Sequence, residues 1–333
     1  MLVTTIYMKK WKLLCAVFTV ALGSLGSPIA VHGKTVDQFV GELKAKARAQ
    51  GADDALLDKV FNNFRPNKKV ISADKSQPED KFKWTKYKNS IVSDYRVQKG
   101  REHYRKNRTL LDRVAKDYGV PAKYIVALWG TETSYGKVTG NYSVPKALAT
   151  MAYEGRREAF FTNEFLRSLQ IIQDGHITFE DMKGSWAGAM GQSQFMPSSF
   201  MRFAVDYDKD GDKDIWNSLP DVFASIANYL SQSGWVEDER WGREVRLPAG
   251  FDLSQEDREA FYPLSHWKRQ GVTFANGQPL PEVNLKAAFM LPGQPQEGAY
   301  LIYPNYNVFL KWNFSRLFAT AVGLLADEIE AGI

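Results

Sequence analysis

One stretch near the middle of the chain is central to predicting its fold: Pro121-Ala-Lys-Tyr-Ile-Val-Ala-Leu-Trp-Gly-Thr-Glu-Thr-Ser-Tyr-Gly136. A proline suits the first turn of a helix and a glycine its exit, so the stretch predicts an apolar helix between these two residues. Residues four apart share a helix face, which aligns Tyr124, Leu128 and Glu132. A carboxyl group held against an apolar face should have a raised pKa, as a general acid for glycosidic-bond cleavage requires. A glutamate that simply points to solvent from a helix end is the alternative.

A second segment, Gly184-Ser-Trp-Ala-Gly-Ala-Met-Gly-Gln-Ser-Gln-Phe-Met-Pro-Ser-Ser-Phe200, is dense in small residues with aromatic residues interleaved. Small residues allow a backbone or a ligand to approach closely. Gln194 can both donate and accept hydrogen bonds, while Trp186 and Phe195 offer faces on which sugars could stack. The mixture suits a neutral, hydroxyl-rich ligand, but a tightly packed loop between core helices would use the same residues.

A run of alternating acids begins an EF-hand-like loop, with Gly211 at the sixth position. The acids are Asp206, Asp208, Asp210, Asp212 and Asp214. Alternate acids and a sharp glycine turn wrap hard oxygen ligands around Ca²⁺. Position 12 is Asn217, where the template has a bidentate glutamate, so we expect Asp221 to substitute for it. The sequence predicts a structural Ca²⁺ site, with Na⁺ as the other candidate ion, and no organic cofactor. A solvated acidic loop is the alternative.

Residues 1–33 predict a secretory signal peptide, because three lysines precede the apolar run Leu13–Leu25 and small residues end it. The run is shorter than the roughly 20 residues of a membrane span; a retained anchor or a buried helix is the alternative. Without these residues the formal net charge falls from +5 to +2, so the charge does not favour a nucleic-acid partner. The only cysteine, Cys15, lies in the leader, which leaves the exported chain without a disulfide.

The rest of the chain alternates between helical and other patterns. Helical spacing of apolar residues is expected over 35–63, 82–118, 158–172, 221–231 and 315–329. Residues 65–80 contain Pro66 and Pro78 and predict a loop. Residues 235–308 combine prolines, short alternating runs and the turn dipeptide Asn276-Gly277, which indicates a small β-rich module. The basic cluster between Lys99 and Arg113 is interpreted as a solvated helix face, with an anionic polymer as its alternative partner.

Two motifs occur together in this chain: Gly-Thr-Glu-Thr-x-Tyr-Gly and Gly-Ser-Trp-Ala-Gly-Ala-Met-Gly-x-x-Gln-Phe-Met-Pro-Ser-Ser. In this pairing the chain resembles the membrane-bound lytic murein transglycosylase B family. The resemblance runs from about residue 35 to the C-terminus, and the second motif is long enough to be specific. It implies an α+β, mainly α fold with a lysozyme-like helical catalytic core. It also implies cleavage of the β-1,4 bond between N-acetylmuramic acid and N-acetylglucosamine without water, which leaves a 1,6-anhydromuramic end.

The expected organisation has five parts. They are a signal peptide (1–33), an N-terminal helical region (34–120), a catalytic core with the EF-hand-like loop (121–235), a β-rich module (236–308) and a C-terminal helix that returns to the core (309–333). The predicted signal peptide implies a periplasmic enzyme, associated with the membrane if the leader is retained. Its expected partners are peptidoglycan glycan strands, with other cell-wall enzymes as candidates, no nucleic acid, and a monomeric state.

The resemblance also implies roles for individual residues. Glu132 matches the single catalytic glutamate, and the implied substrate-binding residues are Tyr104, Arg156, Arg157, Ser185, Gln194, Phe195, Tyr229, Trp312 and Asn313. The arginine pair would lie near the peptide or acetyl groups of the substrate. Trp312 departs from the family pattern, where we expect a tyrosine, so it keeps a stacking surface but loses a hydroxyl.

No second acid accompanies Glu132 in either motif, whereas ordinary glycosidases use two carboxylates. A single glutamate suffices if the substrate itself supplies the nucleophile. A hydrolytic muramidase on the same fold is the alternative within the same broad class. A non-catalytic, calcium-stabilised glycan-binding protein is the alternative from another class, although a binder has no need of a carboxylate on an apolar helix.

Overall fold

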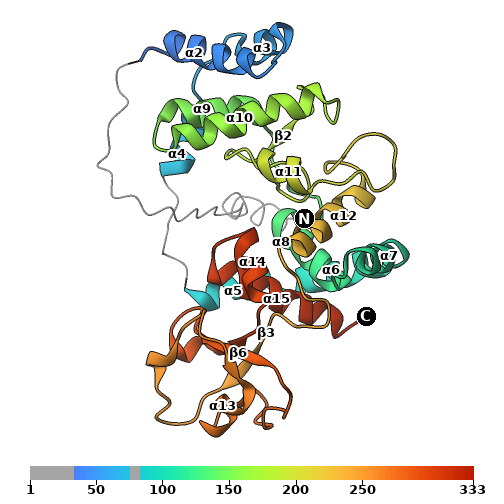
Figure 1. Ribbon diagram of the computed structural model, residues 1–333, viewed down its shortest axis with the longest axis vertical. Helices are drawn as coiled ribbons and strands as arrows, with labels where there is room; N and C mark the ends of the chain where they lie inside the picture. Colours follow the sequence, from blue (N-terminus) through green and yellow to red (C-terminus); the bar gives the residue numbers. More distant parts are fainter. Residues whose placement is uncertain (1–33, 76–82) are drawn as a thin grey trace, which may run out of the picture. The chain divides into compact units, whose positions relative to one another are not determined.

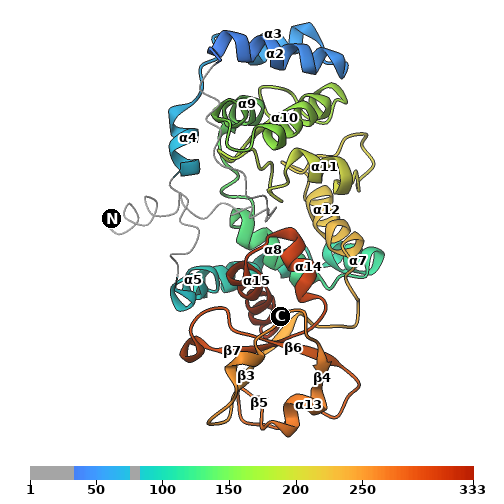
Figure 2. The same cartoon turned by 60° about the vertical axis from the view of Figure 1, so that its left-hand side comes forward.

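The computed structural model describes residues 34–75 and 83–333, and the predicted signal peptide with Cys15 lies outside them. The described residues form two compact units that interleave along the chain. Unit 1 consists of residues 34–75 and 132–228, and unit 2 of residues 83–131 and 229–333. Figures 1 and 2 show the elements of both units in two views.

Unit 1 is helical apart from one short antiparallel ribbon. Its elements are α2 (Val36–Ala49), α3 (Asp54–Phe61), α4 (Lys68–Lys75), β1 (Tyr142–Ser143), α9 (Val144–Glu154), α10 (Glu158–Gln173), β2 (Lys183–Gly184) and α11 (Pro197–Phe203). Helices α9 and α10 pack along each other (Figure 1), and α3, α4 and α11 pack against this pair. The rings of Phe61 on α3 and Phe165 on α10 meet at 5.7 Å in the core.

Helix α4 corrects one expectation from the sequence. Residues 65–80 were expected to form a loop because of Pro66 and Pro78, yet Lys68–Lys75 is helical. Pro66 precedes the helix, where it does not interrupt the helical hydrogen bonds, and Pro78 lies outside the described residues. The Asn67 carboxamide oxygen accepts the backbone N–H of Lys69 at 2.9 Å and so caps the first turn.

Unit 2 contains further helices and a five-stranded sheet. Its elements are α5 (Trp84–Ile91), α6 (Asp94–Lys106), α7 (Arg108–Tyr118), β3 (Gly242–Arg246), η1 (Leu253–Gln255), β4 (Tyr262–Pro263), α13 (Leu264–Arg269), β5 (Thr273–Phe274), β6 (Lys286–Met290), η2 (Pro295–Glu297), β7 (Ala299–Ile302), α14 (Tyr306–Trp312) and α15 (Arg316–Glu330). The strands are antiparallel in the order β4-β6-β7-β3-β5. Helix α15 packs against α5 and α6.

The predicted β-rich module is thus a sheet with its own apolar core. The buried indole of Trp267 on α13 lies in this core and donates a hydrogen bond to the Ala287 carbonyl at 2.9 Å. The predicted turn at Asn276-Gly277 is also present, since Gly277 has a φ of 83° and its N–H donates to the Phe274 carbonyl.

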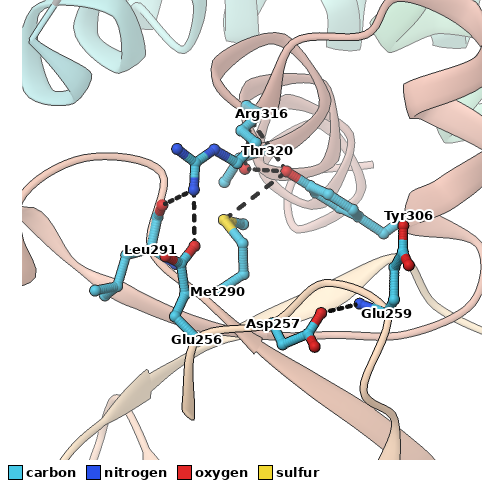
Figure 3. A network of polar contacts seen from close by, with 8 residues as sticks. All are labelled: Glu256, Asp257, Glu259, Met290, Leu291, Tyr306, Arg316 and Thr320. Carbon is cyan, nitrogen blue, oxygen red and sulfur yellow. Dashed lines mark hydrogen bonds and ion pairs between the residues drawn. The ribbon is translucent and has the colours of Figure 1, made fainter. Parts of the chain in front are cut away.

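A polar network ties the sheet to the C-terminal helices (Figure 3). The Arg316 guanidinium donates to Glu256 Oε1 at 2.7 Å and to the Leu291 carbonyl at 3.3 Å. Beside it, the buried Tyr306 hydroxyl lies 3.0 Å from Thr320 Oγ1. Each polar atom named here therefore has a hydrogen-bond partner, as most buried polar groups in native proteins do.

Two helices run from one unit into the other. They are α8 (Ala122–Thr133) and α12 (Leu219–Gln232). Within residues 34–75 and 83–333, no helix is both long and apolar enough to span a membrane.

Candidate functional site

Glu132 occupies the last turn of helix α8, where only 6 % of its surface is exposed. The predicted apolar helix is confirmed: it begins one residue after Pro121 and its Tyr124, Leu128 and Trp129 are buried. The chain leaves the helix through Ser134, Tyr135 and Gly136, which have φ values of 51°, 62° and 79°. Two consecutive non-glycine residues in the left-handed region are strained, and such strain concentrates at functional sites.

A hydrogen-bond relay fixes this helix end to the Gly184–Phe200 segment, which we call the motif loop. Thr133 Oγ1 donates to the Gln192 carbonyl at 2.9 Å and accepts the Gly136 N–H at 3.0 Å. The Gln192 side chain in turn donates to the Trp216 carbonyl at 2.8 Å. The backbone that carries Glu132 is therefore braced by residues distant in sequence.

The motif loop folds back on itself in a tight hairpin. Bridges pair Met190 with both Gly184 and Phe195. Ser185 Oγ accepts the Ala189 N–H at 3.0 Å. Gly184 has no room for a side chain, since a Cβ there would overlap the Ala189 carbonyl oxygen. The small residue at this position therefore allows close backbone packing, as expected for a tightly packed loop.

Gln194 combines a strained backbone with an unused acceptor. Its φ is 52°, and its Nε2 donates to the carbonyls of Gly191 at 2.9 Å and Thr139 at 3.1 Å. Its buried Oε1 has no hydrogen-bond partner among the described residues. Because a buried polar atom without a partner costs free energy, this oxygen is a candidate acceptor for a ligand.

The aromatic residues of the motif loop differ in exposure. Phe195 is only 2 % exposed and packs in the interior, whereas Trp186 is partly exposed. Of the two, Trp186 therefore offers the more accessible ring face.

The arginine pair lies in the short connection between α9 and α10. Both guanidinium groups contact one carboxylate on α4: Arg156 Nη2 lies 2.6 Å from Asp74 Oδ2, and Arg157 Nη2 lies 3.1 Å from Asp74 Oδ1. Asp74 was not predicted from the sequence, because the loop expected there hid the helical spacing that places this residue beside buried Val70.

Glu164 is a second residue whose role was not predicted from the sequence. It is buried on α10, and its Oε2 accepts the Ser198 N–H at 2.8 Å at the start of α11. Burial raises the pKa of Glu164, although the hydrogen bond from Ser198 opposes the shift. Its place among Phe161 and Phe165 at helical spacing was the available signal that it faces the core.

Unit 2 brings together three of the predicted substrate residues. The Tyr229 hydroxyl donates to the Lys311 carbonyl at 2.6 Å, and its ring meets that of Trp312 edge-on at 4.7 Å. The adjacent Asn313 is 4 % exposed, and its buried Oδ1 has no partner among the described residues. Tyr104 is partly exposed on α6, and burial raises its pKa.

The acidic loop brings three carboxylates close together. Asp206, Asp208 and Asp210 each place a carboxylate oxygen within 4.8 Å of the other two. Gly211 has a φ of 109°, which only glycine adopts readily, at the sharp turn of the loop. Oxygens of Asp206 and Asp212 are buried without hydrogen-bond partners among the described residues. Clustered hard oxygens with unused lone pairs fit a calcium ion.

Asp214 and Asp221 lie outside this three-carboxylate group. Asp221 instead accepts the Tyr207 N–H at 2.7 Å and the Asp214 N–H at 2.8 Å, so it ties the two ends of the loop together. Burial raises the pKa of Asp221 to about 6, against the lowering effect of these two hydrogen bonds. Burial, with the nearby charges of Asp210 and Asp214, also raises the pKa of Asp212.

Comparison with known proteins identifies the family to which this chain belongs. The family model "Transglycosylase SLT domain" matches residues 35–327. The chain is 32% identical over 315 residues to the membrane-bound lytic murein transglycosylase B of Escherichia coli (strain K12), an alignment that covers 90% of this chain and 83% of the relative.

Solved structures agree with the sequence relative. SltB3 from Pseudomonas aeruginosa in complex with NAG-NAM-pentapeptide has a TM-score of 0.86 and 41% identity, over 90% of this chain and 81% of SltB3. The same protein has also been solved with NAG-anhNAM-pentapeptide. The Escherichia coli lytic transglycosylase SLT35 in complex with calcium has a TM-score of 0.72 and 28% identity, over 89% of this chain and 92% of SLT35.

These likenesses confirm the mainly helical, lysozyme-like fold class and the identification of a lytic transglycosylase that acts on peptidoglycan. They do not favour the hydrolytic or the non-catalytic alternative. Because the family model spans nearly all of the described residues, the chain belongs to the transglycosylase SLT domain family.

Proposed function

We propose that Glu132 carries the chemistry of this lytic transglycosylase, first as general acid and then as general base. The observation that carries the proposal is the position of Glu132, buried at the end of α8 on a turn that Thr133 fastens to the motif loop. A buried carboxyl group disfavours its charged form, which suits a group that must donate a proton near neutral pH.

The reaction needs one carboxyl group if the substrate supplies the rest. Glu132 protonates the oxygen of the β-1,4 bond between N-acetylmuramic acid and N-acetylglucosamine, and that bond breaks. The N-acetyl group of the muramic residue stabilises the positive charge at the anomeric carbon. The Glu132 carboxylate then takes the proton of the C6 hydroxyl, and the C6 oxygen bonds to the anomeric carbon. The products are an N-acetylglucosamine end and a 1,6-anhydromuramic end.

Other glutamates of unit 1 have contacts that support structural roles for them. Glu164 accepts a hydrogen bond from the start of α11, and Glu154 lies 3.6 Å from Lys75 Nζ in an ion pair. Neither belongs to the turn that carries Glu132. These contacts favour a single-carboxylate mechanism over the two-carboxylate arrangement of ordinary glycosidases.

We also propose how the substrate is held. The free acceptor of Gln194 would take an N–H or O–H of a sugar, and Ser185 would act from the same hairpin. Phe195 would hold this hairpin from the interior. In unit 2, Tyr229 and Trp312 would offer their aromatic rings to the sugars. Asn313 would supply a further acceptor, and Tyr104 a hydroxyl.

The acidic loop is proposed to hold a structural Ca²⁺. Asp206, Asp208 and Asp210 would supply carboxylate ligands, and Asp212 has a buried oxygen available nearby. Asp214 and Asp221 would support the loop through the backbone N–H groups that they accept. The bound ion would neutralise carboxylates that otherwise repel one another, and it takes no part in bond cleavage.

The proposed site of action is the periplasm, after export by the segment of residues 1–33. The relative in Escherichia coli is described as membrane-bound. We propose peptidoglycan strands as the macromolecular partner and a monomeric state for the chain.

Product analysis tests the proposal directly. Purified chain without residues 1–33 is incubated with peptidoglycan sacculi, and the soluble fragments are separated by mass. We expect muropeptides that end in 1,6-anhydromuramic acid, each lighter by one water than its hydrolytic counterpart. Reducing muramic ends would instead identify a lysozyme-type hydrolase and reject the mechanism.

A further inference from the structure

Asp74 is a buried carboxylate that forms ion pairs with two partly exposed arginines. Its side chain is 0% exposed, whereas those of Arg156 and Arg157 are 50% and 32% exposed. A buried carboxylate is stable only when it is paired, and each oxygen of Asp74 contacts a different guanidinium group. The three side chains together keep one excess positive charge, and it faces solvent.

The guanidinium groups keep donors that Asp74 does not use. Each arginine has five N–H donors, and the contact to Asp74 engages one nitrogen of each. The Nε of Arg157 is buried without an acceptor among the described residues. The two guanidinium groups are therefore held in place with further N–H donors for an incoming carboxylate, which guanidinium groups bind in bidentate fashion.

A further contact fixes one of the two side chains, because the Arg157 guanidinium lies over the Phe161 ring at 4.8 Å. The Arg156 backbone N–H, and not its guanidinium group, donates to Glu154 Oε2 at 3.2 Å. Glu154 itself is paired with Lys75, which offsets its charge. Long side chains lose conformational entropy when a ligand orders them, so arginines that are already held bind an anion more tightly.

We propose that Asp74 is a positioning residue, which orients Arg156 and Arg157 to bind the carboxylates of stem peptides and so makes the enzyme prefer peptide-bearing glycan strands. The inference rests on the proposed function, because it needs glycan strands to be the substrate. Asp74 touches neither the substrate nor the reacting atoms; it acts through the two arginines.

The test compares two substrates for each variant: glycan strands that carry stem peptides, and the same strands after an amidase has removed the peptides. The readout is the ratio of kcat/KM on the two substrates. We expect the wild-type chain to prefer peptide-bearing strands. Asp74→Asn should lower the ratio about tenfold, which corresponds to about 1.4 kcal/mol, through a higher KM on peptide-bearing strands.

Two further variants separate positioning from mere stability. Glu154→Gln is the matched control, because it breaks the ion pair to Lys75 on α4 without removing a contact of either guanidinium group, and it should keep the wild-type ratio. In an Arg156→Gln/Arg157→Gln background the preference should be lost, and adding Asp74→Asn should then change the ratio no further.

The outcomes are distinct. A wild-type chain that cuts neither substrate rejects the proposed function itself. An Asp74→Asn variant that slows both substrates equally, or neither, overturns the positioning role. If Asp74→Asn does not fold, the double arginine variant still decides, because a retained preference for peptide-bearing strands in that variant overturns the proposal.

Discussion

In the proposed mechanism Glu132 loses and regains one proton in each turnover, and its surroundings suit that role. It is buried, its backbone leaves α8 through two residues in the left-handed region, and the neighbouring Thr133 anchors the turn to Gln192. Preorganisation of this kind lowers the cost of reaching the transition state, because the group does not have to be repositioned during the reaction.

Glu132→Gln should therefore abolish turnover while leaving the fold intact. An amide matches the carboxyl group in shape but neither donates nor accepts the proton, so we expect kcat to fall by about a thousandfold or more. Release of anhydromuropeptides measures activity, and circular dichroism checks the fold. Glu158→Gln is the control, since Glu158 lies in the first turn of α10. A Glu132→Gln variant as active as the control would exclude Glu132 as the catalytic group.

At the scale of elements, the motif loop is shaped by close backbone approach. Its hairpin brings the Gly184 and Ala189 backbones together, and Gly184 also pairs with Tyr142 in the β1–β2 ribbon. A small residue there is a requirement of packing in unit 1, and it sets the position of Ser185 next to it.

Gly184→Ala should destabilise the protein by about 1–3 kcal/mol, as overpacking of a tight interior does. The added methyl group would overlap the Ala189 carbonyl oxygen. Urea denaturation measures the change in the free energy of unfolding. Gly41→Ala serves as the control, because no atom lies near a Cβ at that helical position and the substitution should stabilise helix α2 slightly. Equal effects of the two substitutions would contradict this account.

The acidic loop should link calcium binding to pH. Without a cation, burial holds the pKa of Asp221 near 6, above its usual 3.8. A raised folded-state pKa means that Asp221 contributes stability below about pH 4, and that this contribution is lost as the pH rises through about 6. A cation held by Asp208 would offset the negative charge that disfavours ionised Asp221, so the increase in Tm that calcium produces should grow between about pH 4.5 and pH 7. Thermal unfolding at the two pH values, with and without calcium, measures it; an equal gain at both would contradict the linkage.

For the whole molecule, the single cysteine means that no disulfide within the chain stabilises either unit. Unit 2 relies on a buried core and on satisfied junctions such as the Tyr306 and Arg316 network of Figure 3. Unit 1 carries three clustered carboxylates, whose mutual repulsion opposes folding unless a cation is bound.

Removal of calcium should therefore lower the stability of the intact protein. A ligand present at a hundred times its Kd adds about 2.7 kcal/mol, which predicts a fall in Tm of about 5 °C on chelation. Differential scanning calorimetry before and after chelator treatment measures it. The Asp208→Asn/Asp210→Asn variant is the control and should not respond to chelator. A wild-type Tm that does not move would argue against a structural ion.

The sequence by itself determined the apolar helix that carries Glu132, the small-residue motif loop, the acidic loop and the β-rich character of residues 236–308. Each depends on local patterns of residue type and spacing, which act within a few turns of chain. Helix α4 was wrongly expected to be a loop, because two prolines outweighed a short helical pattern between them. Only the tertiary structure decided that Asp74 on that helix holds Arg156 and Arg157, and that Glu164 caps α11. Those pairings join residues 34 to 83 positions apart, and such contacts arise from packing, which no local pattern encodes.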